Sequence, residues 1–538
     1  MKFINKLKTV LVAGSMAAAM FACTDLEELN VDPNNPSEVP ASYLLTSGQK
    51  YAMENVWDEW ANGRFGLVYS QYWSQQAYPS ESRFRYRDSS VNGQWISYFA
   101  AGGLKDLKAS MDIASEILGN DAIVGETKDR ASNQYAVAQI TRVWLMHLIT
   151  DIWGPVPYTE ALQGNDIVAP TYDKQEMIYS SLLTELSEAQ GKIVSSTGVD
   201  GDVIYGGNMA KWSKFAQSLK LRIALRMADR DNGVKLAEVV AEGGFIAGNE
   251  DNATLIFGSA PHNNPLNEDR KTRADFAASN TMVDLLSDMS DPRMMLYFDP
   301  TEESMTPPED APADWVPTPK YEGVIYGLDD NTANNLDISK YSQPSQATLY
   351  EKAPGIYISY PEVCFALAEA AQRASNTTLA ASQYEAGIRA SMEFWNAQAT
   401  LAGMTRTIAQ ADIDAYVIAH PYDAANWKTS LGIQKWIALY MQGHQGWIEW
   451  RRLDFGVLRS PVAGHDRGNG DIPVRRPYPT DEQTLNLSSY NSGVEVLNSE
   501  AGFTGSGEFQ GDNLNNPVWW DMTKGTQVAV DENGNPIP

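Results

Sequence analysis

Aromatic and polar side chains gather in two long stretches that lack helical periodicity, residues 63–90 and 297–355. An aromatic ring offers a flat apolar face to a sugar ring, while amide and guanidinium groups can bond the sugar hydroxyls. A peptide would use the same rings with more backbone hydrogen bonds. Because long loops on a rigid scaffold commonly carry function, both stretches are predicted to contact a ligand. The candidate contacts are Trp73, Gln76, Tyr78, Arg83, Trp315 and Tyr321.

Within this candidate set, Trp73 and Trp315 are the predicted stacking platforms, with Tyr78 and Tyr321 beside them. Gln76 and Arg83 are the predicted polar partners. The alternative is that Trp73 and Trp315 pack beneath their own loops and contribute to the core instead.

No catalytic constellation is recognisable in the sequence. The five histidines are far apart, and no two have metal-ligand spacing on one helix. No Gly-x-Ser-x-Gly elbow and no phosphate-binding glycine loop is present. The 68 acidic side chains are too many to search for an acid/base pair, so a glycoside hydrolase remains an alternative. We therefore predict no catalytic residues and no cofactor.

A cluster of carboxylate and amide side chains lies in the second stretch. Its members are Asp329, Asp330, Asn331, Asn334, Asn335 and Asp337. These oxygens suit calcium, but the segment lacks the glycine and the terminal glutamate of an EF-hand loop. A solvated polar turn is the simpler interpretation, and we predict no metal site.

Helical periodicity dominates the remaining chain and supplies the elements that must position these loops. The predicted helices cover residues 43–62, 91–118, 131–153, 172–193, 208–231, 234–243, 273–290, 360–375, 378–396, 408–419 and 430–452. Antiparallel helix pairs fit this spacing, although no repeat signature is readable. The chain from 460 to 538 is predicted to be loop-like.

Several large side chains are assigned to this scaffold. The tryptophans at helical spacing are predicted to be core residues, namely Trp95, Trp144, Trp212 and Trp436. Arg451 and Arg452 are predicted to hold carboxylates of neighbouring helices. Cys364 lies in an apolar helical run and is predicted to be a small buried hydrophobe.

The N-terminal residues predict where in the cell the protein is located. Basic residues precede an apolar run over residues 10–21, which is too short for a permanent membrane helix and is typical of a secretory signal. The sequence Met-Phe-Ala-Cys ending at Cys23 resembles a bacterial lipobox. We therefore expect residues 1–22 to be a lipoprotein signal peptide, Cys23 to be lipidated, and residues 23–42 to form a tether. Two or three acyl chains are sufficient for stable anchoring.

The net charge excludes one class of partner. The chain carries 41 basic and 68 acidic side chains, a formal charge of −27. Such a surface repels phosphate backbones, so no nucleic-acid partner is expected. The 15 tryptophans and 25 tyrosines point instead to contacts with a flat, uncharged ligand. The acidic surface suits neutral glycans and basic peptides alike.

Four segments, in this order along the chain, resemble the SusD/RagB family of nutrient-binding outer-membrane lipoproteins. They are residues 138–161, 202–226, 359–392 and 434–482. The first ends in the turn Gly-Pro-Val-Pro before Tyr158, and the acidic residues after Cys23 are similar to a Bacteroidetes surface-export signal. Gln217 replaces the asparagine more common in the family, and Met20 replaces the usual lipobox leucine; both changes are conservative.

The resemblance implies a mainly α protein, a tetratricopeptide-like helix-pair scaffold with long irregular loop excursions, in which residues 43–538 form one domain. It implies a cell-surface, lipid-anchored protein of the outer membrane that is not an enzyme. It also implies a SusC-like TonB-dependent transporter as partner, which the protein caps and supplies with ligand. An oligosaccharide is the favoured ligand. The alternatives are an oligopeptide-binding lid, a surface glycoside hydrolase and a purely structural lid.

Overall fold

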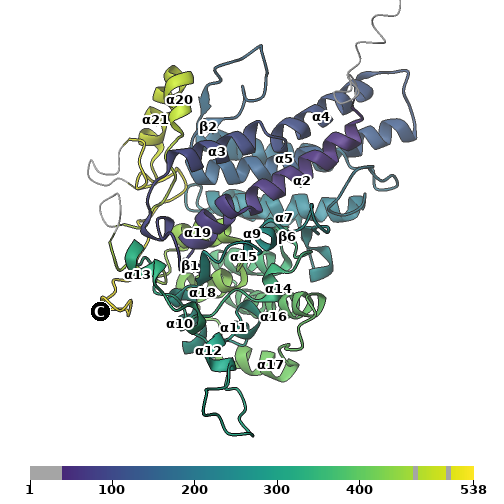
Figure 1. Cartoon of the computed structure of the whole chain (residues 1–538). Coiled ribbons are helices and arrows are strands. Elements are labelled where there is room, and N and C mark those ends of the chain that lie inside the picture. The colour runs from purple at the N-terminus through teal and green to yellow at the C-terminus, as the bar shows by residue number, and fades with distance from the viewer. Residues whose placement is uncertain (1–38, 465–470, 504–510, 538) are drawn as a thin grey trace, which may run out of the picture.

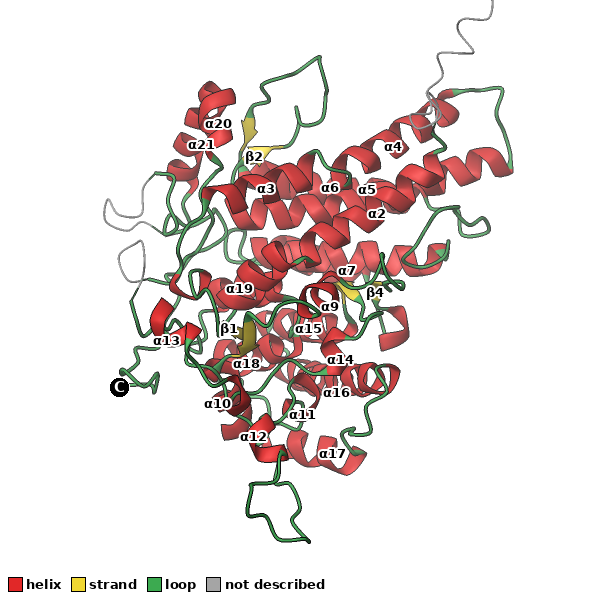
Figure 2. Cartoon of the chain, viewed as in Figure 1, coloured by secondary structure: helices red, strands yellow, loops and turns green. Residues whose placement is uncertain are grey.

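The computed structural model describes residues 39–464, 471–503 and 511–537, and helices dominate it (Figures 1 and 2). The predicted signal peptide, Cys23 and most of the tether lie outside the described residues. None of the described helices combines the length and the apolar character that crossing a membrane requires.

The N-terminal half is a stack of helices that pack against their sequence neighbours. It contains α2 (Ala41–Trp57), α3 (Asp88–Phe99), α4 (Gly103–Gly119), α5 (Glu126–Trp153), α6 (Gln175–Lys192), α7 (Met209–Met227) and α8 (Val234–Glu242). Helix α4 packs on both α2 and α5, α5 packs on α6, and α6 packs on α7. This neighbour-to-neighbour packing is typical of helix-pair solenoids, so the predicted mainly α, helix-pair scaffold is confirmed.

The C-terminal half mixes long core helices with short surface ones. The long helices are α15 (Tyr360–Arg373), α16 (Thr377–Leu401), α17 (Gln410–Ala419), α18 (Trp427–Ala438), α19 (Gly443–Leu453) and α21 (Leu487–Glu500). The short helices are α9 (Pro265–Arg270), α10 (Asn280–Asp288), α11 (Met294–Tyr297), α12 (Glu302–Met305), α13 (Asp330–Asn334), α14 (Gln346–Leu349) and α20 (Thr480–Leu485). Helix α15 packs along α16, and α18 packs against α15 and α19.

Short antiparallel strand pairs join segments distant in sequence. The pairs are β1 (Trp73–Gln75) with β5 (Phe276–Ala278), β2 (Val156–Pro157) with β3 (Tyr172–Asp173), and β4 (Ala253–Leu255) with β6 (Gly355–Ile358). A π-helical segment, η2 (Glu59–Leu67), follows α2 directly. The 3₁₀ turns are η3 (Glu81–Arg83), η4 (Asn249–Asp251) and η5 (Ile338–Lys340).

Two predicted helices are broken in the structure, each at a glycine. The helix predicted over 91–118 divides into α3 and α4, because Gly102 adopts a φ of +116° that side-chain-bearing residues rarely tolerate. The helix predicted over 430–452 divides into α18 and α19 before Gly443. A Cβ at Gly443 would lie 2.2 Å from the carbonyl carbon of Gly66, so the break lets α19 approach the η2 backbone closely.

Two further boundaries differ from the sequence-based expectation. The helix predicted from 273 begins only after Ser279, whose hydroxyl accepts from the N–H of Thr281, because the preceding residues form β5. The region from 460 onward, expected to be loop-like, contains α20 and α21. Both predictions were wrong, since short strands and short polar helices leave little periodic signal.

One connected hydrophobic core extends from Leu45 to Trp520, and it contains the four tryptophans assigned to it. Arg452 bonds Glu369 at 2.5 Å and Glu449 at 2.7 Å, as predicted. The prediction for Arg451 was wrong. Its guanidinium lies 3.7 Å from the ring centroid of Trp447 and donates to the backbone carbonyls of Val474, in the C-terminal segment, and Asp151, in α5.

Candidate functional site

Trp73, a predicted stacking platform, lies in the core. Its side chain is 2% exposed, and its indole N–H donates to the hydroxyl of Tyr440 at 3.0 Å. Its ring packs at a tilt against Phe276, 5.5 Å between centroids, across the β1–β5 pair. The Trp73 ring is therefore not available to a ligand in this structure, and its position matches the alternative of packing beneath its own loop.

The other residues of the first loop contact the second loop, Gln76 at Gln343 and Tyr78 and Arg83 at α13. Gln76 is buried, and its side-chain amide exchanges hydrogen bonds with that of Gln343 at 3.1 and 3.4 Å. Tyr78 is 57% exposed, and its backbone N–H donates to Asn334 Oδ1 at 3.1 Å. Arg83 lies 3.9 Å from Asp330. The structure thus brings these two predicted loops together, with Tyr78 as the exposed ring at their junction.

The polar cluster that begins at Asp329 forms the start of α13. The Asp329 carboxylate accepts from the backbone N–H groups of Asn331 and Thr332 at 2.9 and 3.0 Å, as an N-cap residue does. A hydrogen bond from the Thr332 hydroxyl, together with those from the two backbone N–H groups, lowers the pKa of the carboxyl. This arrangement is a capped polar turn.

Trp315 and Tyr321 lie apart from that junction. Trp315 lines a hollow of about 600 Å³ formed by α12, the segment around Val316, and Ser339. In Figure 1 this segment extends beyond α12 at the lower edge of the molecule. Tyr321 is partly buried and packs against the main core, and burial raises the pKa of its hydroxyl. The two predicted platforms, Trp73 and Trp315, therefore do not form one site.

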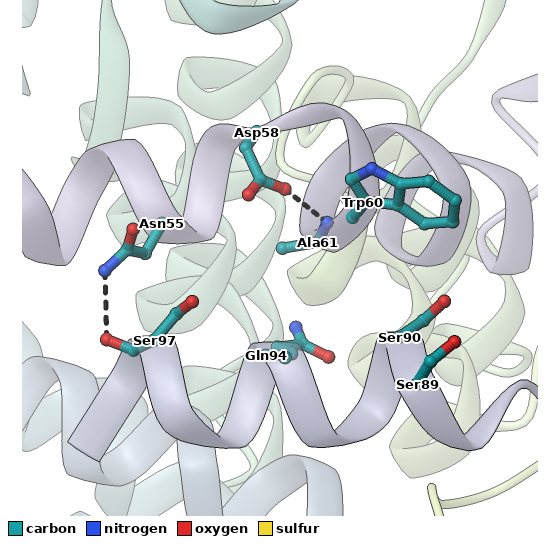
Figure 3. Close-up of a pocket in the computed structure, with 9 residues that line it drawn as sticks. Asn55, Asp58, Trp60, Ala61, Ser89, Ser90, Gln94 and Ser97 are labelled. Atoms are coloured by element: carbon teal, nitrogen blue, oxygen red, sulfur yellow. Dashed lines mark hydrogen bonds between the residues drawn. The ribbon is translucent and has the colours of Figure 1, made fainter. Parts of the chain in front are cut away.

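A different surface combines an exposed ring with converging polar groups (Figure 3). It lies where α2 ends and η2 begins, opposite α3. The first hollow there has a volume of about 290 Å³, near the lower end of the range for small-ligand sites. Its lining residues are Asn55, Asp58, Trp60, Ala61, Ser89, Ser90, Gly93, Gln94 and Ser97.

Trp60 supplies the ring. It is 43% exposed, and the Arg64 guanidinium lies 4.7 Å from its ring centroid. Arg64 is itself buried and bonds Glu59 at 2.8 Å, Glu81 at 3.3 Å and Asp275 at 2.5 Å. The anchored guanidinium covers one face of the ring, so the exposed area belongs to the other face and the edge. Trp60 is thus held in place before any ligand arrives, which lowers the entropic cost of binding.

Asp58 supplies a carboxylate beside the ring. Its Oδ1 accepts from the backbone N–H of Ala61 at 2.6 Å, which caps η2. Burial, opposed by this hydrogen bond and assisted by the neighbouring Glu59 charge, raises the pKa of Asp58 to about 6. No ion pair reaches Asp58 within the described ranges.

The facing wall is a stripe of small polar residues on α3. Ser90, Gly93 and Ser97 repeat at helical spacing, and a Cβ built at Gly93 would meet no atom within 4 Å. The Asn55 side-chain amide donates to the carbonyl of Ser97 at 3.0 Å and bridges α2 and α3. Figure 3 shows this bridge at one end of the hollow and the Trp60 ring at the other. The serine hydroxyls between them can both donate and accept.

A second hollow, of about 590 Å³, shares Asn55, Asp58 and Trp60 with the first. It extends to α9 and the segment before it. Its further lining residues are Lys50, Tyr51, Glu54, Glu59, Pro261, His262, Asn263, Pro265, Glu268 and Asp269. We call the two hollows together the Trp60 groove. Tyr51, 41% exposed, gives this groove a second aromatic ring.

Sequence reasoning missed Trp60 because it lies three residues after Trp57. Such spacing places both rings on one face of a helix, and a helix was predicted through residue 62. The chain instead leaves the α-helix at Asp58, so that Trp57 is buried and Trp60 faces solvent. The one available signal was the adjacent Asp58-Glu59 pair, since acidic residues cap helices more often than they continue a buried face.

Comparisons with known proteins identify the fold. Residues 33–479 match the SusD-like family described as "Starch-binding associating with outer membrane". A solved chitin-binding protein is 26% identical, with a TM-score of 0.75, over 90% of this chain and 100% of its own. A Bacteroidetes SusD-like protein, AC2a, is 21% identical with a TM-score of 0.72 over the same shares. A SusD homologue from Bacteroides thetaiotaomicron VPI-5482 is 20% identical with a TM-score of 0.68, and the match covers 90% of this chain and 100% of that protein. No protein of curated function matches the chain significantly.

Proposed function

The chain belongs to the SusD-like family, and on that premise we propose that it is a nutrient-binding protein that captures oligosaccharide in the Trp60 groove. The observation that carries the proposal is the Trp60 ring, exposed on one face and fixed by Arg64 on the other, beside hydroxyl, amide and carboxyl groups. A pyranose presents an apolar face and a rim of hydroxyls, which this combination complements. The starch-binding description of the family and the solved chitin-binding relative support a glycan.

The location and the partner are part of the same proposal. Lipid on Cys23 anchors the protein to the outer membrane with its helical domain on the cell surface. There it acts as a lid on a SusC-like TonB-dependent transporter and delivers captured ligand to it. The family description, which names association with the outer membrane, supports this arrangement. The lipobox resemblance supports the anchor.

A peptide ligand is the first alternative, and the walls of the groove argue against it. Extended peptides gain much of their affinity from main-chain hydrogen bonds to an open strand edge. The groove is bounded by α2, η2, α3, α9 and the segment before α9, and the backbone groups of its helices bond mainly within those helices. A peptide would therefore find no strand edge among the residues that line the groove.

The predicted loop residues are the second candidate site. Trp315 lines its own hollow, and Tyr78 with Arg83 lies at the loop junction near α13. Tyr321 and Gln76 would hold these loops in place and would not contact the ligand, since both side chains are at least partly buried. The Trp60 groove is favoured because ring, hydroxyls and carboxylate converge in one place.

A titration with the soluble Cys23→Ala protein tests the site. The probes are maltohexaose, cellohexaose and the N-acetylglucosamine hexamer, measured by isothermal titration calorimetry. Truncating a ring that anchors a ligand typically costs about 2 kcal/mol or more, roughly thirtyfold in affinity. We expect Trp60→Ala to cause that loss, and the matched control Trp315→Ala to leave affinity unchanged. The reverse pattern would place the site in the loop hollow.

The same samples test the class of function. Chromatography of each probe after long incubation should show no shortened product. Product release would establish a hydrolase, and a complete absence of binding would support the structural lid. For the anchor, Cys23→Ala should shift the protein from the membrane fraction to the soluble fraction; continued partition with membranes would mean that the anchor lies elsewhere.

A further inference from the structure

We infer that the Trp60 groove selects oligosaccharides that carry free amino groups, with a ligand ammonium paired to the carboxylates of Asp58 and Asp269. The inference rests on the proposed function and names the ligand class of that same groove. Asp58 stands where the two hollows meet, and Asp269 lines the second hollow on α9. The ligand is a glycan of hexosamine units, at least one of them not acetylated.

The groove is strongly acidic, and most of its charges have partners. Its carboxylates are those of Glu54, Asp58, Glu59, Glu268 and Asp269. Glu54 bonds Lys50 at 3.1 Å, and Glu268 bonds Lys271 at 2.7 Å. Glu59 bonds Arg64 at 2.8 Å. Every lysine or arginine involved is thereby committed to a carboxylate that is not Asp58 or Asp269.

Asp58 and Asp269 form no ion pair with any residue of the described segments, although Arg273, which pairs with Glu59 at 3.5 Å and Asp275 at 3.4 Å, acts on Asp269 in the direction that lowers its pKa. The remaining basic group on the groove wall is the His262 imidazole. Burial raises the pKa of Asp58 to about 6 and that of Asp269 to about 7. For Asp269, the negative charge of Glu59, a hydrogen bond with the Glu59 side chain and the negative charge of Asp275 add to this rise, and the Arg273 charge opposes it. Both carboxylates are therefore costly to ionise in the free protein.

An ammonium group in the groove would remove that cost. It would supply a positive charge and donate hydrogen bonds to carboxylates that form no ion pair among the described residues. A neutral sugar of the same shape would cover the carboxylates without pairing them, which adds a desolvation penalty instead. The groove should thus discriminate an amine-bearing glycan from its acetylated or neutral counterpart.

The rest of the groove favours a sugar over a lysine-rich peptide as the source of the amine. The Trp60 and Tyr51 rings and the α3 serine hydroxyls suit a ring with a polyhydroxyl rim. The helical walls provide no strand edge for a peptide backbone. A lysine side chain would satisfy the carboxylates but leave the rings and hydroxyls largely unused.

The test compares four probes at about pH 7, where a hexosamine amine is still partly protonated and Asp58 is mostly ionised. The probes are the glucosamine hexamer, the N-acetylglucosamine hexamer, cellohexaose and hexalysine. A charge-assisted hydrogen bond contributes about tenfold or more in affinity, so the glucosamine hexamer should bind at least about tenfold more tightly than either neutral hexamer. Asp58→Asn and Asp269→Asn should each reduce that ratio, because they weaken binding of the glucosamine hexamer and do not weaken binding of the neutral probes.

Glu54→Gln is the matched control, since Glu54 lines the same hollow but already has Lys50 as a partner; the ratio should survive this change. The inference would be overturned, and the proposed function would stand, if charged and neutral hexamers bound with equal affinity and Trp60→Ala abolished the binding of both. Failure of every saccharide to bind would overturn both. Tighter, Trp60-dependent binding of hexalysine would overturn the inference in favour of a basic peptide.

Discussion

Replacing Asp58 with asparagine should stabilise the protein, and only above the pH at which the carboxyl ionises. Asparagine is nearly isosteric, and its side-chain oxygen can still accept from the Ala61 N–H and cap η2. The substitution therefore removes the buried charge and little else. Because Asp58 has no cationic partner among the described residues, backbone N–H groups offset only part of the loss of its hydration in the free protein.

The magnitude follows from the pKa. Burial raises the pKa of Asp58 from 3.8 to about 6, and about 1.4 kcal/mol per pKa unit makes this about 3 kcal/mol at most. The folded protein holds the proton more strongly than the unfolded chain does. The carboxyl therefore lowers the free energy of unfolding progressively as pH rises from about 4 to about 6, and by a constant amount above that range.

The assay is urea unfolding, followed by tryptophan fluorescence, of the wild-type protein and Asp58→Asn at several pH values. The two proteins should have equal free energies of unfolding near pH 4, and the variant should be more stable by up to about 3 kcal/mol near pH 8. Glu54→Gln, which removes a partly exposed ion pair, should change stability by less than about 1 kcal/mol. A difference for Asp58→Asn that is the same at both pH values would refute the buried-charge argument, and with it the physical basis for ammonium selection.

Three further outcomes are expected. Trp73→Ala should lower the free energy of unfolding by about 3–5 kcal/mol, seen as a lower melting temperature, while the affinity that depends on Trp60 is retained; lost affinity without lost stability would return Trp73 to the binding site. Gly443→Ala should yield little folded protein on expression, because its Cβ would lie 2.2 Å from the backbone of Gly66; a normal yield would show that the α19–η2 contact can relax. In the Cys23→Ala protein, Cys364 should react with a disulfide reagent at about pH 8 only after unfolding, since burial raises the pKa of its thiol to about 12; rapid labelling of the folded protein would contradict this burial.

The sequence alone determined the scaffold, because helical periodicity is a local property. The apolar spacing over 208–231 predicted α7, and tryptophans at that spacing, such as Trp212, are buried as expected. Cys364 was likewise assigned correctly to the core, since it lies within an apolar run. Local patterns did not predict the helix break at Gly443, because that break depends on contact with a segment distant in sequence.

The tertiary structure alone decided which rings face a ligand. Trp57, Trp60 and Trp73 lie close together in sequence, but Trp57 and Trp73 are buried and Trp60 is exposed. Two long-range contacts accompany this difference: β1 pairs with β5 at Trp73, whereas a hollow lies between Trp60 and α3. Asp58 and Asp269, which form no ion pair among the described residues, could be recognised only once the neighbouring charges had their partners in space. Exposure and charge pairing are properties of contacts between distant segments, so the groove emerges from the fold and not from any stretch of the chain.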